Sequence, residues 1–551
     1  MSESTSAPRV QRMHQILLWP LRLMPLGNAA AAPVRPWELL LAQPDSPWRE
    51  VVDEYTGELA DFHERHYQEF VTFLPYVQRF LYGEGREGTG SGMKVLRRSD
   101  IAQLRARTRP GAAPVTLDVV HVDLYFFFDV DVVLLNVELS AADLELSLAQ
   151  DLLYRIGRAY PSGWDAKGLP LHMLAESEWL AADGTVLARS DATERERFMA
   201  HVGAQRAPRL TEHWDFVLRP LASEHASEPG LLSFRQIEYY RMPMMAWLAL
   251  DDPQKLSRGD FVRFGLVTGN QDDVGEHMPE LPPESLPFAG THLEDFERRY
   301  CYDRFWHAGG AAPHTRYLCS GHALVVVGRA DADFFCCRDR GVLAQFRHQH
   351  FLVFLIAHFQ KAALLMFSDR LAEALRRLDV SNADNVRRFK RAIRGAFEGF
   401  LRFSHRYWFH AVSDQAQTRA LYRMSADHLE LDTLHAEVKT RVIDMSSYLD
   451  ADSLRRQANT VVRLTVVTVL GLIGSVTTGF LGMNLLAEAD APMLERVLVF
   501  AAALGGTVAL TLYTMAKSKR LSDFLDVLSD ERLSWGAKWR VFFAVWRRGG
   551  G

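Results

Sequence analysis

The amino-acid sequence predicts an α/β domain followed by an all-α C-terminal half, in which a long stalk helix leads into two transmembrane helices. The segment Val115–Leu139 is rich in β-branched and aromatic residues, which favours two or three neighbouring strands. No proline occurs between Pro313 and Pro492, which is typical of helices because an interior proline costs about 3 kcal/mol. Two uncharged stretches of 20 residues, Leu464–Met483 and Val497–Ala516, can each cross a hydrocarbon core about 30 Å thick.

Composition argues against several classes of protein. The chain has 551 residues, too many for one ordinary core, and its net charge of −5 argues against a nucleic-acid binder. Its four cysteines, Cys301, Cys319, Cys336 and Cys337, favour a reducing compartment over a disulfide framework. No catalytic constellation stands out, so we do not expect an enzyme.

The front domain shows strand and helix patterns in turn. After the strands of Val115–Leu139, the segment Ala141–Tyr160 carries apolar residues at helical spacing. Further strands are expected at Phe261–Val267 and Ala323–Val327. The apolar start, Gln15–Met24, is interrupted by a proline and an arginine, and we do not interpret it as a signal peptide.

The back half is predicted to be three long helices. Ala344–Leu378 has the pattern of a buried helix, Asn385–Phe409 forms a second, and a third runs from Ser413 through the first span to Met483. The part of this third helix before the span carries apolar residues at spacings of three, four and seven. Such a stripe indicates either ordinary helix packing or an oligomeric stalk.

The positive charges orient the two spans. Arg455, Arg456 and Arg463 precede the first span, Lys517, Lys519 and Arg520 follow the second, and the connecting Leu485–Glu495 has no Lys or Arg. We expect the chain to lie in the cell inner membrane. By the positive-inside rule both termini are then cytoplasmic, and the short connection faces outward.

Small and polar residues gather on one side of the first span. Thr468 and Ser475 lie seven residues apart, Leu472 and Gly479 form an adjacent row, and Val461 and Leu464 continue this face towards the cytoplasm. Close helix packing explains such a face, and so does the lining of a pore. Because neither span contains Asp, Glu or His, a cation would pass by hydroxyls, backbone carbonyls and retained water.

A polar tripeptide, Gly482-Met483-Asn484, ends the first span. The amide of Asn484 lies next to a helix end, where backbone carbonyls are unpaired. One amide is a weak metal ligand, but a ring of amides from several subunits can hydrogen-bond the water shell of Mg²⁺. This use of Asn484 requires an oligomer, because two spans cannot enclose a pore.

These features together resemble the CorA family of divalent-cation transporters, a group of two-span proteins with a Gly-Met-Asn motif. The resemblance covers about Ala411–Arg520, and the front domain matches in general character only. It implies a homopentamer in the lipid bilayer with Gly482, Met483 and Asn484 as the selectivity filter for hydrated Mg²⁺, or for Co²⁺ or Ni²⁺. The pore would be lined by Val461, Leu464, Thr468, Leu472, Ser475 and Gly479, with hydrophobic rings near its cytoplasmic end as the gate. No cofactor is implied beyond the transported ion.

The resemblance divides the chain into six parts. They are a cytoplasmic N-terminal α/β domain at 1–340, cytoplasmic helices and stalk at 341–459, the first span with the motif at 460–484, an extracytoplasmic loop at 485–494, the second span at 495–516, and a basic cytoplasmic tail at 517–551.

Three departures from the family pattern bear on the transported ion. Leu481 replaces the usual aromatic residue before the tripeptide, the outer loop lacks the Met-Pro-Glu-Leu pattern, and the front domain is longer than usual. The zinc-transporting ZntB branch, in which transport is coupled to protons, shares the tripeptide and also departs in this loop. An alternative of another class is a cytoplasmic sensor or enzyme that the two spans merely anchor.

Other acidic residues and the cysteines are candidates for metal or cation sites. Glu488 and Asp490 in the loop either attract cations to the entrance or form a solvated turn. The stalk carboxylates either include regulatory metal sites of unknown position or form a solvated helix face. The cysteines and histidines between Cys319 and His350 lack the spacing of a structural zinc site.

Overall fold

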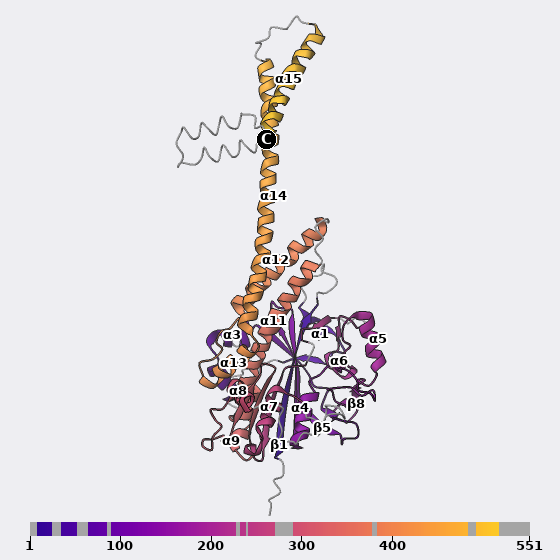
Figure 1. Ribbon diagram of the computed structural model, residues 1–551, viewed down its shortest axis with the longest axis vertical. Coiled ribbons are helices and arrows are strands. Elements are labelled where there is room, and N and C mark those ends of the chain that lie inside the picture. The colour runs from indigo at the N-terminus through magenta and orange to yellow at the C-terminus, as the bar shows by residue number, and fades with distance from the viewer. Residues whose placement is uncertain are drawn as a thin grey trace, which may run out of the picture. The chain divides into compact units, whose positions relative to one another are not determined.

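A computed structural model describes residues 8–24, 35–51, 64–84, 90–226, 232–238, 241–269, 290–376, 383–482 and 492–516 (Figure 1). The chain divides into two compact units, Met1–Ile443 and Asp444–Gly551. Helix α14 (Leu431–Gly482) begins in the first unit and ends in the second.

The first unit is built on a sheet of fourteen strands. Its main path runs in the order β12-β13-β14-β11-β1-β6-β5-β4-β7-β8, and among the described pairs only β11·β14 and β9·β10 are parallel. The strands are β1 (Arg9–Leu23), β2 (Trp48–Glu50), β3 (Met93–Arg98), β4 (Gln103–Arg107), β5 (Val115–Phe127), β6 (Val132–Glu145), β7 (Glu176–Leu180), β8 (Val186–Arg189), β9 (Leu221–Ser223), β10 (Leu232–Gln236), β11 (Met244–Leu250), β12 (Cys301–Tyr302), β13 (Arg316–Cys319) and β14 (Ala323–Arg329). A mixed sheet domain before a helical half is therefore confirmed.

Helices cover the sheet and make up the rest of the described chain. They are α1 (Pro36–Ala42), α2 (Glu64–Thr72), α3 (Pro75–Tyr82), α4 (Leu146–Arg155), α5 (Arg195–Gln205), α6 (Glu212–Leu218), η1 (Pro253–Lys255), α7 (Arg258–Leu266), α8 (Gly290–Tyr300), α9 (Asp333–Cys336), α10 (Val342–Gln345), the π-helical turn η3 (Phe346–His350), α11 (Phe351–Arg376), α12 (Ala383–Arg406), α13 (Ala416–His428), α14 and α15 (Met493–Ala516). The strands expected in Val115–Leu139 and Ala323–Val327 are confirmed as β5, β6 and β14.

The apolar segment near the start of the chain is the central strand β1. It pairs with β6 along one edge, from Arg9 to Arg22. Along the other edge it pairs first with β11, up to Leu17, and then with β10, from Leu21. Pro20 therefore lies between the β11-paired part and the β10-paired part of β1. A proline there, which lacks an N–H, does not interrupt the hydrogen bonds to either of these two strands.

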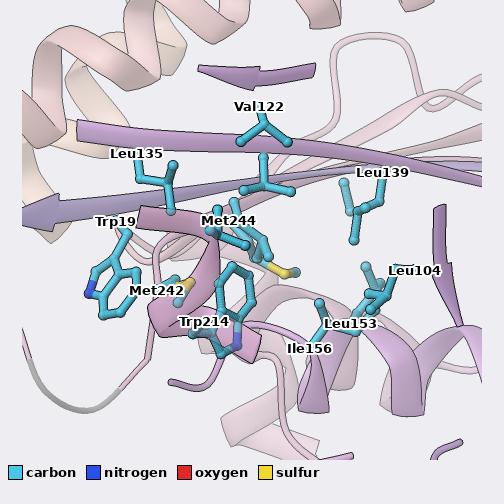
Figure 2. Packing of buried hydrophobic residues seen from close by; sticks show 14 of the residues in the cluster. Trp19, Leu104, Val122, Leu135, Leu139, Leu153, Ile156, Trp214, Met242 and Met244 are labelled. Carbon is cyan, nitrogen blue, oxygen red and sulfur yellow. The ribbon is translucent and has the colours of Figure 1, made fainter. Parts of the chain in front are cut away.

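Alternation along the strands divides the core between two faces. On one face Trp19, Leu135 and Val122 point towards Trp214 of α6 and Leu153 of α4 (Figure 2). On the other face α11 covers β1 and β6, and the ring of Phe127 stacks on Phe359 with 3.8 Å between centroids. Burial on both faces explains the unbroken apolar runs of these strands.

The helical half departs from the prediction at one point. The helices expected at Ala344–Leu378 and Asn385–Phe409 are present, but the third is interrupted between α13 and α14. Glu430 there has a φ of 54°, a left-handed conformation that ends a helix. Beside the break, the rings of His428 and Tyr300 stack with 4.5 Å between their centroids, a contact between residues distant in sequence.

The strand expected at Phe261–Val267 is wrong, because this segment is helix α7. Its start carries a reciprocal cap: the Asp260 amide donates to the Ser257 hydroxyl at 3.1 Å, and the Ser257 amide donates to the Asp260 carboxylate at 2.9 Å. This capping box satisfies two backbone donors and favours a helix.

We expect Ser257→Ala to lower the free energy of unfolding by about 1 kcal/mol, because the cap is lost. Ser257→Thr is the matched control, since its hydroxyl keeps both the acceptor for the Asp260 amide and the donor to the Asp260 carboxylate at 2.7 Å. Chemical denaturation followed by tryptophan fluorescence measures both. Equal stability of the alanine variant and the parent chain would contradict this role of the cap.

A buried ion pair ties η3 to the sheet. Glu138 of β6 accepts from Arg347 at 2.6 and 3.2 Å and lies 3.1 Å from Nδ1 of His14, with only 4% of its side chain exposed. Burial by itself raises the pKa of the Glu138 carboxyl, but the His14 hydrogen bond and the Arg347 pair outweigh it and lower the pKa to about 2. In the unfolded chain the same carboxyl has a pKa of about 4.3.

The pKa of Glu138 predicts an acid-dependent loss of stability. Ionised Glu138 stabilises the fold fully above about pH 5, and this contribution, on the order of 3 kcal/mol, is lost as the pH falls through about 2. Denaturation midpoints at several pH values should therefore fall more steeply for the parent chain than for Glu138→Gln. Glu176→Gln is the control, because the Glu176 side chain is 67% exposed. Parallel pH profiles of parent and Glu138→Gln would refute this coupling.

Candidate functional site

The predicted site lies on the part of α14 that belongs to the second unit. The structure describes the predicted pore face, which we define as Val461, Leu464, Thr468, Leu472, Ser475 and Gly479, together with Gly482 at the end of the helix. Met483 and Asn484 of the predicted filter and Glu488 and Asp490 of the loop lie outside the described residues.

The pore face is exposed along its whole length. Val461, Leu464 and Leu472 keep 61%, 63% and 65% of their surface accessible, and Thr468, Ser475 and Gly479 are exposed as well. Large apolar side chains on a continuous open face are typical of a surface that meets lipid or another subunit. The structure thus brings these six residues together on one side of the helix.

The opposite side of α14 packs against α15 (Figure 1). Thr477, which is 6% exposed, shares its hydroxyl hydrogen between Thr507 Oγ1 at 2.9 Å and the carbonyl of Ile473 on its own helix at 2.8 Å. Thr477 lies nine residues from Thr468, about two and a half helical turns, so the two side chains point in opposite directions. Less exposed residues follow at four-residue spacing on both helices: Val469 and Ile473 on α14, and Val499 and Ala503 on α15.

The hydroxyl groups of the pore face donate to their own helix. Thr468 Oγ1 donates to the Leu464 carbonyl at 3.0 Å, and Ser475 Oγ donates to the Gly471 carbonyl at 3.0 Å. A hydroxyl has one hydrogen and two lone pairs, so once the hydrogen is used the oxygen can only accept. This arrangement suits water or a hydrated cation and disfavours an anion.

The glycines of the first span are not explained by packing within one chain. Among the described residues, a Cβ atom added at Gly471, Gly479 or Gly482 would meet no atom within 4 Å. Close packing of α14 on α15 therefore does not need glycine at these three positions. Glycine at these positions would instead allow another molecule to approach the helix closely, or would leave the helix backbone accessible.

The thiol and histidine groups of the first unit form no metal centre. Within the described ranges no group of three or more His, Cys, Asp or Glu side chains is placed to hold a metal ion. Cys319 is buried, with its sulfur 3.2 Å from the hydroxyl of Ser425. Burial raises the pKa of the Cys319 thiol, which is therefore a poor nucleophile.

By length and hydropathy, one helix in the described part of the chain could cross a membrane. It is the continuous segment Val342–Arg376, and 83% of its most apolar window is buried inside the fold, as in the core helix of a soluble domain. Several side chains of the two predicted spans are not among the described residues. Their crossing of a membrane stays a prediction.

Comparisons with known proteins give no relative. No protein-family model matches the chain, and no curated protein or solved structure matches it.

Sequence reasoning missed the partner of Thr477. The second span contains Gly505-Gly506-Thr507, a cluster of small and polar residues of the kind found at membrane helix interfaces. The row Val499, Ala503 and Thr507 at four-residue spacing was the signal that could have identified its packing face.

We expect Thr477→Val and Thr507→Val to be non-additive, with a coupling energy of about 0.6 kcal/mol, because each removes the same interhelical hydrogen bond. Thr478 gives the matched control, since its hydroxyl donates only within α14, to Gly474 at 2.9 Å and Ser475 at 3.2 Å. Thr478→Val combined with Thr507→Val should be additive. Reversible unfolding in mild detergent measures the double-mutant cycles, and equal coupling in both would argue against the Thr477–Thr507 contact.

Proposed function

We propose that the chain is a channel-like transporter of hydrated divalent cations, Mg²⁺ foremost, in which α14 of each subunit lines a shared pore across the cell inner membrane. The observation that carries this proposal is the exposed pore face, on which hydroxyl oxygens are left as acceptors while the opposite face packs on α15.

The chemistry of this face favours a cation that keeps its water. Neither span contains Asp, Glu, His, Lys or Arg between Leu464 and Met483 or between Val497 and Ala516. A cation that shed its water there would find no charge to compensate the loss. Mg²⁺ dehydrates reluctantly, so hydroxyl oxygens that accept hydrogen bonds from its water shell are suitable contacts.

The same face supports a homo-oligomer. Two helices cannot enclose a pore, and the apolar Val461, Leu464 and Leu472 are more than half exposed in the single chain. Around a central axis these side chains would form hydrophobic rings, which close a pore by excluding water. A homopentamer is the assembly that the family resemblance implies.

Asn484 is the proposed selectivity filter together with Gly482 and Met483. A helix end at the tripeptide would leave backbone carbonyls unpaired beside the Asn484 amide. A ring of Asn484 amides would then meet the ion's water shell before it enters the pore. Glu488 and Asp490 would raise the local concentration of cations at that entrance.

The membrane potential supplies the driving force for uptake. A divalent ion gains roughly 4.6 kcal/mol per 100 mV when it moves inward, because each elementary charge gains about 2.3 kcal/mol. No chemical energy source is needed for transport in this direction. A proton-coupled carrier would instead depend on a proton gradient.

We expect Asn484→Ala to reduce Mg²⁺ uptake into proteoliposomes at least tenfold, because the ring of amides is lost. Thr477→Ser is the matched control: it keeps the hydroxyl on the face that packs on α15, so uptake should stay within twofold of the parent. Ion-sensitive dyes inside the vesicles measure uptake of Mg²⁺, Co²⁺, Ni²⁺ and Zn²⁺.

Two outcomes would redirect the proposal. Zn²⁺ flux that depends on a proton gradient, with little Mg²⁺ flux, would favour the zinc-transporting alternative. Absence of any cation flux from correctly assembled oligomers would favour a cytoplasmic sensor or enzyme held by a membrane anchor.

A further inference from the structure

A cavity of about 150 Å³ lies in the first unit between the end of α2, the π-helical turn η3 and the start of α13. We call it the amide cavity, because five of its nine lining residues are glutamines. They are Gln68, Gln345, Gln349, Gln415 and Gln417.

The lining of the amide cavity carries no formal charge at neutral pH. Besides the glutamines it consists of Val71, the hydroxyl residues Thr72 and Thr418, and His350. Burial lowers the pKa of His350 to about 4, so its imidazole is neutral. The neighbouring Glu69 is not part of the lining and pairs with Nδ1 of His348 at 3.1 Å.

One buried residue of the lining has a polar atom without a partner among the described residues. His350 is 2% exposed, and its Nδ1 atom has no hydrogen-bond partner there. An unpaired polar atom in a buried place is costly, so it calls for an explanation such as a bound water or ligand. His350 is one of the residues that line the cavity.

The backbone around His350 is itself unusual. The chain passes from α10 into α11 through η3, a π-helical turn with a wider hydrogen-bonded ring than an α-helix. Such turns are rare and are frequent at functional sites. Here the turn carries Gln349 and His350, and Gln345 comes directly before it, so three lining residues depend on this local conformation.

We propose that the amide cavity binds a small uncharged molecule that carries a carboxamide or urea group. A carboxamide both donates and accepts, so it can pair reciprocally with the glutamine side chains. A charged ligand would lose its hydration without gaining an opposite charge, and an apolar ligand would leave the amides unpaired. An apolar cavity of about 150 Å³ holds benzene, which sets the ligand at roughly six non-hydrogen atoms.

The test uses propionamide and propionate as probes, since the two have nearly the same shape and differ in charge. Ligand-observed NMR with the full-length chain should show millimolar binding of propionamide and at least tenfold weaker binding of propionate. Glycerol and propanol are added as competitors, and we expect neither to displace propionamide at equal concentration. Equal binding of the two probes, or displacement by the alcohols, would overturn the assignment to an amide.

Variants locate the probe in the amide cavity. Gln349→Met keeps the length of the side chain and removes its hydrogen bonds, and should weaken propionamide binding at least fivefold. Gln103→Met is the matched control, because Gln103 is a partly buried glutamine on β4 and does not line the cavity. Thr418→Val, which removes a buried hydroxyl at nearly constant volume, decides the question should Gln349→Met fail to fold.

The inference stands apart from the proposed transport. Propionamide binding is measured without a membrane gradient, so loss of transport and loss of this site are separate results. Displacement of propionamide by Mg²⁺ would show a cation site in place of an amide site and would overturn the proposal. Unchanged binding in both Gln349→Met and Thr418→Val would do the same, because the probe would then bind elsewhere.

Discussion

The hydrogen bond between Thr477 and Thr507 is the contact on which the proposed transport site depends. By joining α14 to α15 it fixes which side of α14 is turned towards its neighbour. The face that remains is the one with Thr468, Ser475 and Gly479, half a turn away.

The two units satisfy the hydrophobic effect in different ways. In the first unit β1 and β6 bury both faces, one under α4 and α6 and the other under α11, so almost every strand residue near the centre is inaccessible. In the second unit large apolar residues such as Leu472, Leu498 and Val508 are 65%, 61% and 44% exposed in the single chain. An apolar surface of this kind is typical of a surface that lipid or another subunit covers. If neither covered it, the exposed apolar residues would favour aggregation.

The sequence was informative where a pattern is local. The runs of β5, β6 and β14, the proline-free helices and the common face of Thr468 and Ser475 all follow from periodicity. It failed at the break at Glu430, which lies beside the packing of His428 on Tyr300, a tertiary contact that no local pattern contains. The segment Phe261–Val267 differs, because the Ser257-to-Asp260 capping box at the start of α7 is a local signal in the sequence that favours a helix over the strand indicated by its valines and phenylalanines. The partner of Thr477 lies thirty positions away on another helix, so the row of Val499, Ala503 and Thr507 indicates a packing face on α15 but not which residue of α14 meets it.

Cysteine accessibility along α14 tests most directly whether this face lines an aqueous pore. In a background without Cys301, Cys319, Cys336 and Cys337, single cysteines are placed at Thr468, Ser475 and Gly479 on the pore face, and at Ile473 and Thr477 on the face turned to α15. The account predicts that a charged methanethiosulfonate reagent modifies the first three in proteoliposomes, that Mg²⁺ slows the reaction, and that the last two stay unmodified. Equal modification on both faces, or none on the pore face, would contradict it.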